Sequence, residues 1–220
     1  MGLPSIQIET APNPRHVVIW LHGLGADGRD FEPIVPELVD PQWPALRFVF
    51  PDAPIRPITI NGGMPMRAWY DISGQEIAQR QDEVGIRASI GLLDELIAGE
   101  VARGIASENI LLAGFSQGGA IVLAGGIRHA QRLGGIVALS TYLPMAEKTD
   151  AEISAANRSV PLFMAHGKLD PTISHALGEM SRDYLKQRSY VVDWHSYPMA
   201  HQVCAEEIAD LRRWIGTRLG

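Results

Sequence analysis

The chain has 220 residues, of which 46% are hydrophobic and 20% charged, and its formal net charge is −6. This size and composition are typical of a globular α/β protein with a substantial core, so we expect residues 1–220 to form one domain. The negative charge argues against a nucleic-acid-binding protein, whose surface is usually basic. The single cysteine excludes an internal disulfide.

The amino-terminal residues lack the positive leader and the apolar core of a secretory signal peptide. No apolar run in the sequence reaches the roughly 18 residues that a membrane-spanning helix needs. We therefore expect a cytoplasmic protein without stable membrane insertion.

Short apolar segments alternate with longer amphipathic segments along the chain. Continuous apolar runs, bounded by glycine or proline, predict buried strands at 16–23, 46–54, 109–116, 134–141, 160–167 and 190–197. Helical spacing of apolar residues predicts helices at 82–103, 117–130, 174–188 and 202–219. This alternation predicts a mostly parallel sheet with helices on both faces. Functional groups of such sheets lie on loops at the carboxyl ends of the strands.

The segment AGFSQGGA places Ser116 between a predicted strand and a predicted helix. Gly114 and Gly118 flank this serine at a spacing of two, and a sharp strand-to-helix turn needs residues without side-chain bulk there. The turn exposes the hydroxyl near a helix amino terminus, whose free N–H groups favour negative charge. The pattern indicates a nucleophilic serine, with a serine that only caps the helix as the alternative.

A serine of ordinary pKa is a weak nucleophile, so it needs a base and a group that orients the base. On a sheet of this kind the partners follow in the order Asp or Glu and then His, each after a later strand. Asp170 follows the predicted strand 160–167, and His201 follows the predicted strand 190–197. We therefore predict Ser116, Asp170 and His201 as the catalytic residues.

Other acids and histidines fit this pattern less well. Asp193 and His195 lie two residues apart within one predicted strand, share a face, and are interpreted as structural. His166 ends a strand and is interpreted as a structural or supporting residue. No partner is predicted for His129 or His175.

Acyl transfer places negative charge on the former carbonyl oxygen, and each donor aimed at that oxygen contributes about 2.7–4 kcal/mol. We expect one donor to be the amide of Gln117, which follows the serine. The second is expected in the glycine-rich segment LHGLGADGRDF, with the amide of Leu24 as the candidate. The same segment has the form of a dinucleotide-binding loop, but no acidic residue ends a second strand about 20 residues later.

Cys204 stands three residues after His201, which suggests a thiol nucleophile or half of a metal site. The assignment of His201 to Ser116 removes the reason for the first, and no further ligands of suitable spacing predict the second. Cys204 shares one face of the predicted last helix with Ile208 and Leu211. We interpret it as a small packing residue.

Six segments extend over most of the chain: LHGLGADGRDF, FPDAPIRPITINGGMPMRAWYDI, DEVGI, GFSQGGA, HGKLDP and MAHQV. Together and in this order they resemble the phospholipase/carboxylesterase family of small α/β-hydrolases, which includes bacterial carboxylesterases and acyl-protein thioesterases. The resemblance implies an α/β-hydrolase fold, with a mostly parallel central sheet flanked by helices and no separate cap domain. It also implies the same three catalytic residues and the same two backbone donors.

The resemblance further implies that one loop partly covers the site. This loop contains Met64, Met66, Trp69 and Tyr70, which we predict as substrate-binding residues that form an acyl-binding wall. The alternative is that they anchor the loop by packing. We expect Pro65 to alter the shape of the loop, so the resemblance does not fix the preference for acyl chain length.

These features predict a serine carboxylesterase that hydrolyses short- to medium-chain carboxylic esters through an acyl-enzyme. An acyl-protein thioesterase or a lysophospholipase would use the same residues, because esters and thioesters form the same kind of tetrahedral intermediate. A non-catalytic binding protein of the same fold would be expected to have an incomplete triad. The chemistry implies no metal or organic cofactor. The expected partner is a small ester or lipid-like substrate, and the family resemblance is compatible with a homodimer.

Overall fold

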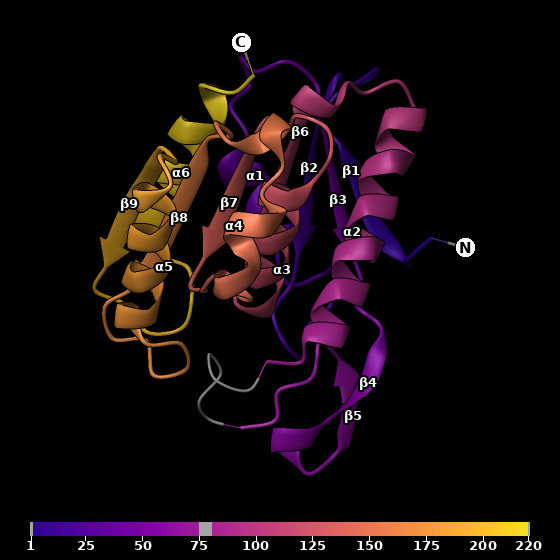
Figure 1. The fold of residues 1–220 in the computed structure, drawn as a ribbon. Coiled ribbons are helices and arrows are strands. Elements are labelled where there is room, and N and C mark those ends of the chain that lie inside the picture. Colours follow the sequence, from indigo (N-terminus) through magenta and orange to yellow (C-terminus); the bar gives the residue numbers. More distant parts are fainter. Residues whose placement is uncertain (1, 75–80, 220) are drawn as a thin grey trace.

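A computed structural model describes residues 2–74 and 81–219, which form a seven-stranded sheet in the order β1-β3-β2-β6-β7-β8-β9 (Figure 1). Its strands are β1 (Ser5–Glu9), β2 (His16–Leu21), β3 (Leu46–Pro51), β6 (Ile110–Phe115), β7 (Gly135–Leu139), β8 (Leu162–Gly167) and β9 (Val192–Tyr197). Only β1 runs antiparallel to its neighbour, and the other pairings in this sheet are parallel. The predicted, mostly parallel sheet is therefore confirmed.

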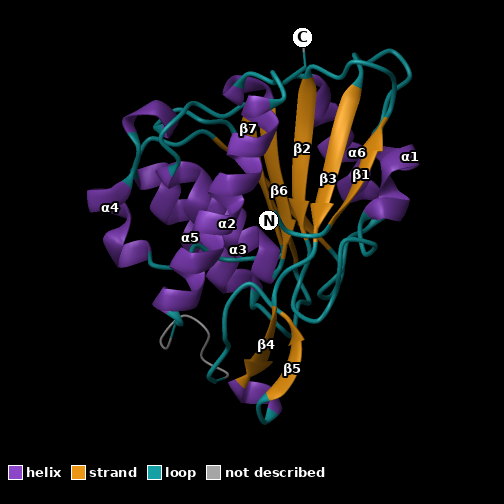
Figure 2. Cartoon of the chain, turned by 90° about the vertical axis from the view of Figure 1, so that its right-hand side faces the viewer, coloured by secondary structure: helices purple, strands orange, loops and turns teal. Residues whose placement is uncertain are grey.

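Helices cover both faces of the sheet (Figures 1 and 2). The α-helices are α1 (Val35–Leu38), α2 (Glu83–Ala102), α3 (Gln117–Arg128), α4 (Thr149–Glu152), α5 (His175–Gln187) and α6 (Ala205–Gly216). The 3-10 turns are η1 (Glu32–Ile34), η2 (Thr59–Asn61), η3 (Ser107–Asn109), η4 (Ala146–Lys148) and η5 (Ala155–Asn157). Of the helices in the described part of the chain, none combines the length and the apolar character needed to cross a membrane.

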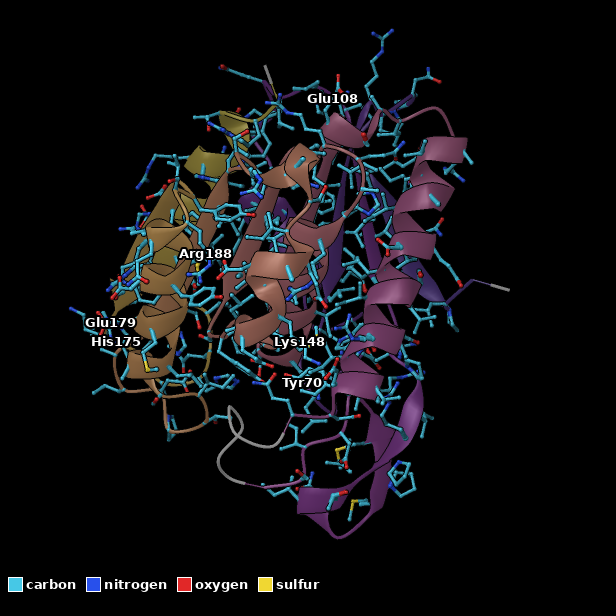
Figure 3. The ribbon with its side chains drawn as sticks, in the orientation of Figure 1. Tyr70, Glu108, Lys148, His175, Glu179 and Arg188 are labelled. Atoms are coloured by element: carbon cyan, nitrogen blue, oxygen red, sulfur yellow. The ribbon has the colours of Figure 1, made fainter. Side chains whose placement is uncertain are left out.

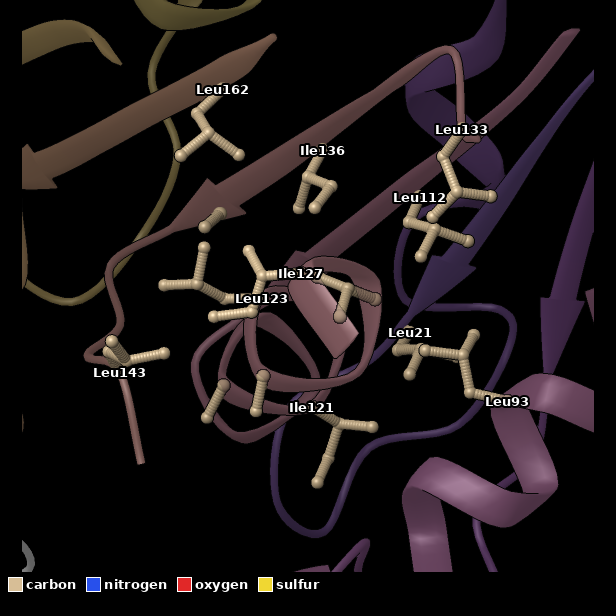
Figure 4. Packing of buried hydrophobic residues seen from close by; sticks show 14 of the residues in the cluster. Leu21, Leu93, Leu112, Ile121, Leu123, Ile127, Leu133, Ile136, Leu143 and Leu162 are labelled. Atoms are coloured by element: carbon tan, nitrogen blue, oxygen red, sulfur yellow. The ribbon is translucent and has the colours of Figure 1, made fainter. Parts of the chain in front are cut away.

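The strands contribute side chains to two cores, one on each face of the sheet. In β2, Val17, Ile19 and Leu21 pack in the core beneath α2 and α3. The alternate residues Val18 and Trp20 pack on the opposite face with residues of α1 and α6. Burial on both faces explains why these strands are continuous apolar runs rather than alternating ones. Figure 4 shows the first core around α3.

Two strand pairings were not predicted from the sequence. The first is β1, a short, partly exposed edge strand that pairs with β3. The second is the hairpin of β4 (Ile55–Ile58) and β5 (Met64–Arg67), which lies below the carboxyl ends of the sheet strands (Figure 2). Pro57 and Pro65 face each other in this hairpin. Proline lacks the N–H that a strand ladder uses, so the segment resembles a loop in the sequence.

The amino terminus of α3 packs directly against the end of β2. A Cβ atom added to Gly118 would lie 2.3 Å from the carbonyl oxygen of Leu21 and 2.6 Å from that of His22. A Cβ added to Gly114 would lie 2.5 Å from the carbonyl carbon of Gly118. The two glycines predicted to allow a sharp turn are therefore in positions that exclude any side chain.

The first turn of α6 contains a fully buried carboxyl group. Glu207 has 0% relative exposure, and the backbone of Cys204 is the hydrogen-bonding neighbour that partly offsets the burial of its carboxyl group. Burial, with a smaller contribution from the negative charge of Asp210, raises the pKa of Glu207 from 4.5 to about 8. We therefore expect the folded protein to keep a proton on this side chain at neutral pH.

We expect Gly118→Ala to destabilise the protein by more than about 2 kcal/mol, because the new methyl group would overlap two backbone carbonyls. Gly91 is the matched control, since it also lies in a helix and a Cβ there would meet no atom within 4 Å. Gly91→Ala should stabilise the protein by about 0.5–1 kcal/mol, because alanine has the higher helix propensity. Urea unfolding of both variants measures the difference, and equal effects would contradict the packing argument.

We expect Glu207→Gln to be more stable than the wild type, and we expect the difference to grow between about pH 4.5 and pH 8. The lower limit is the ordinary pKa of the carboxyl group, and the upper limit is its pKa in the folded protein. The unfolded chain loses this proton above its ordinary pKa while the folded chain retains it, so the wild type loses stability over that window at up to about 1.4 kcal/mol per pH unit. The neutral amide has no such dependence. Exposed Glu206 supplies the control Glu206→Gln, and chemical denaturation at pH 5, 6.5 and 8 measures the effect. A stability gain that does not grow with pH would contradict the assignment.

Candidate active site

Ser116 lies at the junction of β6 and α3, where it is the N-cap of the helix. Its backbone has φ 53° and ψ −119°, a conformation that non-glycine residues rarely adopt. The conformation is held by hydrogen bonds: the Ser116 N–H donates to Leu139 O at 2.9 Å, and its carbonyl accepts from Thr141 Oγ1 at 2.7 Å. The serine is therefore kept in a strained turn by the neighbouring strand β7 and the loop after it.

His201 and Asp170 form a line of hydrogen bonds with this serine. His201 lies on the loop between β9 and α6, with Nε2 2.9 Å from Ser116 Oγ and Nδ1 2.6 Å from Asp170 Oδ2. A carboxylate can only accept, so Nδ1 donates to Asp170 and Nε2 accepts from the serine hydroxyl. The three residues that the sequence predicts as partners are thus within hydrogen-bond distance, each after the carboxyl end of a parallel strand.

Asp170 is held from the opposite side by backbone amides. Its side chain has 0% exposure, and Oδ1 accepts from the N–H groups of Thr172 at 2.8 Å and Ile173 at 2.9 Å. These bonds compensate for the burial of the carboxyl group. His166 Nε2 donates to Ile173 O at 2.8 Å and lies 3.4 Å from Asp170 Oδ2. Burial lowers the pKa of His166, which agrees with its interpretation as a supporting residue.

The backbone segments of the two predicted donors border Ser116. Gln117 is the first residue of α3, and N–H groups in the first turn of a helix have no acceptor within the helix. Leu24 lies in the loop after β2, next to Gly23. A Cβ added to Gly23 would lie 3.5 Å from Ser116 Cβ, so this loop passes directly beside the serine. The amide of Gly25 donates to Arg67 O at 2.9 Å, which ties the loop to β5.

His22 holds this loop from within the protein, a role that the sequence did not reveal. Its Nε2 accepts from the Ala53 N–H at 3.0 Å, because an amide can only donate. Nδ1 therefore carries the proton and donates to Gly23 O at 2.7 Å. His22 is 1% exposed, and burial lowers its pKa, so the neutral ring keeps one donor and one acceptor. The glycine-rich composition of the segment is the only signal that marks this region in the sequence.

The four predicted substrate-binding residues occupy different environments. Trp69 and Tyr70 are 1% and 2% exposed and belong to the core, which supports the alternative that they anchor the loop. Figure 3 shows Tyr70 where the β4–β5 hairpin joins the body of the molecule. Met66 is half-buried, with its sulfur 3.8 Å from the position of a Cβ on Gly25. Met64 is 61% exposed on the hairpin.

A second serine–histidine pair lies between α5 and β9. His175 Nε2 is 2.8 Å from Ser196 Oγ, and Nδ1 is 3.5 Å from a carboxyl oxygen of Glu179 (Figure 3 labels His175 and Glu179). Ser196 lies within β9 rather than at a strand-to-helix junction, so no helix begins at the residue after it. The pair has the hydrogen bonds of a nucleophile and a base, but its serine lacks the sharp turn that holds Ser116 at the start of α3.

The remaining rival residues are placed elsewhere. His195 Nε2 lies 2.9 Å from Asp193 Oδ1 within β9, as expected for a structural pair. His129, for which no partner was predicted, bonds to Asp94 at 2.7 Å. Within the described residues, 2–74 and 81–219, no group of three or more His, Cys, Asp or Glu side chains is arranged to hold a metal ion.

Cys204 departs from the prediction in one respect. The last helix begins at Ala205 rather than at residue 202, so Cys204 is its N-cap and not an interior helix residue. The side chain is half-buried and packs against the core on the α6 face of the sheet, as predicted. Burial raises the pKa of the Cys204 thiol, which disfavours the thiolate that a nucleophile requires.

Comparison with known proteins places this arrangement in a family. The model of the phospholipase/carboxylesterase family matches residues 3–219. Acyl-protein thioesterase 1 of Yarrowia lipolytica is 37% identical to this chain over 219 residues, which cover 96% of each chain. A probable carboxylesterase of Oryza sativa is 32% identical, and the match covers 99% of this chain and 83% of the rice protein.

Solved structures agree in the fold. Acyl-protein thioesterase 2 of Zea mays superposes with a TM-score of 0.85 and 28% identity, covering 98% of this chain and 99% of the maize chain. SOBER1 of Arabidopsis thaliana gives a TM-score of 0.89 at 28% identity, covering 94% of this chain and all of that structure. These matches confirm the predicted α/β-hydrolase fold. With a family model that extends over nearly its whole length, the chain belongs to the phospholipase/carboxylesterase family of α/β-hydrolases.

Proposed function

We propose that this chain is a serine hydrolase that cleaves acyl thioesters through an acyl-enzyme, with Ser116 as the nucleophile. The observation that carries the proposal is the line of two hydrogen bonds, 2.9 Å from Ser116 to His201 and 2.6 Å from His201 to Asp170. This geometry meets the requirement that the base touches the nucleophile and a third group orients the base.

In the first half-reaction Ser116 Oγ attacks the acyl carbonyl carbon while His201 Nε2 takes the hydroxyl proton. Negative charge then develops on the carbonyl oxygen, where the backbone N–H groups of Gln117 and Leu24 would donate to it. When the intermediate collapses, the bond to the leaving sulfur or oxygen breaks, and His201 returns the proton to that atom. The products of this step are the free thiol or alcohol and an acyl ester on Ser116.

In the second half-reaction water replaces the serine hydroxyl. His201 takes a proton from the water, the resulting hydroxide attacks the acyl ester, and the proton passes to Ser116 Oγ as the acid leaves. Asp170 keeps Nδ1 protonated in both steps and stabilises the imidazolium that forms. The two amide bonds to its Oδ1 leave Oδ2 directed at His201.

The names of the relatives favour a thioester over a simple ester. The protein of Yarrowia lipolytica that is 37% identical is an acyl-protein thioesterase 1, and several other fungal relatives at 34–36% identity carry the same name. This favours the thioesterase, which the sequence raised as an alternative, over the carboxylesterase that it put first. The second candidate is a carboxylesterase of short- to medium-chain esters, for which the rice relative at 32% identity is the supporting observation.

We expect Ser116→Ala to lower kcat by at least about 10³-fold, because the variant lacks the nucleophile while its fold is retained. Ser196→Ala is the matched control, since Ser196 also bonds to a histidine Nε2, at 2.8 Å. A fluorophosphonate probe should label the wild type and Ser196→Ala but not Ser116→Ala. Activity at the wild-type rate in Ser116→Ala would overturn the proposed mechanism. Absence of labelling in the wild type would instead favour a non-catalytic binding protein.

We expect a peptide with an S-acylated cysteine to be hydrolysed with a higher kcat/KM than the same peptide with an O-acylated serine. The pair differs in one atom of the leaving group, so the comparison isolates the preference for thioester over ester. Acyl chains of four, eight and sixteen carbons give the chain-length preference, and Ser116→Ala supplies the blank. A preference for the oxygen ester would restore the carboxylesterase, and faster hydrolysis of a lysophospholipid would indicate a lysophospholipase.

A further inference from the structure

The side chain of Gln117 joins the turn that carries Ser116 to the segment after the hairpin. Gln117 is 2% exposed, and its Oε1 accepts from the Trp69 N–H at 2.7 Å. Its Nε2 donates to Tyr70 O, also at 2.7 Å. Both ends of the amide are used and their roles are fixed by the backbone partners, so the side chain has one orientation. The residue that supplies one candidate oxyanion donor therefore also binds the backbone at 69–70.

Trp69 continues this connection to the other candidate donor. Its indole Nε1–H donates to the carbonyl oxygen of His22 at 2.9 Å, and the two rings lie 5.4 Å apart. The carbonyl of Trp69 accepts a hydrogen bond from Ser89 Oγ, and the side chain is 1% exposed. The indole is thus buried between two segments that border Ser116.

His22 completes the link to the loop after β2. Its ring bonds to Gly23 O at 2.7 Å and to the amide of Ala53 at 3.0 Å. A series of hydrogen bonds between buried groups therefore runs from Gln117 through Trp69 to His22 and Gly23, and the next residue is Leu24. Each bond joins groups that would be costly to leave unpaired in the interior.

We propose that Trp69 is a positioning residue that sets the separation of the Gln117 and Leu24 amides, an inference that rests on the proposed function. Two donors stabilise one oxyanion only when both lie about 2.7–3.1 Å from it. These donors come from a helix terminus and a glycine-rich loop, so covalent geometry alone does not fix their separation. The indole N–H bond to His22 O and the Gln117 bond to Trp69 N supply that constraint.

The test compares Trp69→Phe with Trp20→Phe. Both remove a buried indole and keep an aromatic ring, but Trp20 Nε1 has no hydrogen-bond partner within the described residues, whereas Trp69 Nε1 bonds to His22 O. We expect Trp69→Phe to lower kcat by about 10- to 100-fold with KM changed less than about threefold, because the loss falls on the transition state. Trp20→Phe should leave both constants within about twofold, since it alters packing alone.

A trifluoromethyl ketone with the acyl chain of the substrate adds the readout that separates positioning from packing. Addition of Ser116 Oγ to this ketone gives an oxyanion, so its inhibition constant should rise in Trp69→Phe by the same factor by which kcat/KM falls. Thermal unfolding of both tryptophan variants checks that they lose similar stability. Should Trp69→Phe fail to fold, Gln117→Met takes its place, because it keeps the backbone amide and the length of the side chain but removes the acceptor of the Trp69 N–H.

Three results would overturn the inference. The first is wild-type kcat and an unchanged inhibition constant in Trp69→Phe. The second is a rise in KM with kcat and the inhibition constant unchanged, which would make Trp69 part of the acyl-binding wall. The third is an equal loss of activity in Trp20→Phe, which would make the effect one of packing. Each is distinct from failure of the proposed function, because that failure is measured with Ser116→Ala and with probe labelling of the wild type, not with the tryptophan variants.

Discussion

The contact between the first turn of α3 and the end of β2 determines how the site is built. At Gly118 the helix approaches the carbonyls of Leu21 and His22 so closely that no Cβ fits. Because α3 begins that close to the strand, the chain must turn sharply at Ser116, and the turn requires a positive φ. The same approach brings Gly23 into contact distance of the serine. One packing constraint therefore places the hydroxyl, the helix amino terminus and the glycine-rich loop together.

Hydrogen bonds between buried groups then maintain this arrangement. Asp170, His22 and Gln117 are all buried, and each uses its side chain to bind backbone groups of the loops around Ser116. Such bonds are directional, so they specify positions that apolar packing would leave free to slide. The contrast is Glu207 in α6, whose burial outweighs the hydrogen bond from the backbone of Cys204 and raises the pKa of its carboxyl group to about 8. The side chains around Ser116 are held by hydrogen bonds to the backbone, whereas burial of Glu207 mainly shifts its carboxyl group toward the neutral form.

The three residues that meet at the candidate site could be predicted from the sequence because the signal for each is local. Ser116 lies between glycines at a strand-to-helix junction, and Asp170 and His201 each follow an apolar strand. Parallel strands bring their carboxyl ends to one edge of the sheet, so the order of strands along the chain is enough to expect that the three meet. Other features gave weaker signals. The prolines of the β4–β5 hairpin make its sequence look like a loop. The sequence predicts that the last helix begins at residue 202, three residues before its actual start at Ala205, because an apolar pattern does not mark an N-cap that lacks a capping side chain.

The sequence by itself determined the order of the six parallel strands and the four long helices, the turn at Ser116 and the residues that would meet there. These depend on short-range patterns of apolar, glycine and polar residues. Only the tertiary structure decided that Trp69 is buried as a bridge between Gln117 and His22, and that His22 holds the loop of Leu24 through its ring. Such contacts join residues from separate segments of the chain. The sequence around a single buried donor or acceptor has no periodic pattern from which its hydrogen-bond partner could be predicted. Their positions follow from which loops the folded sheet brings side by side.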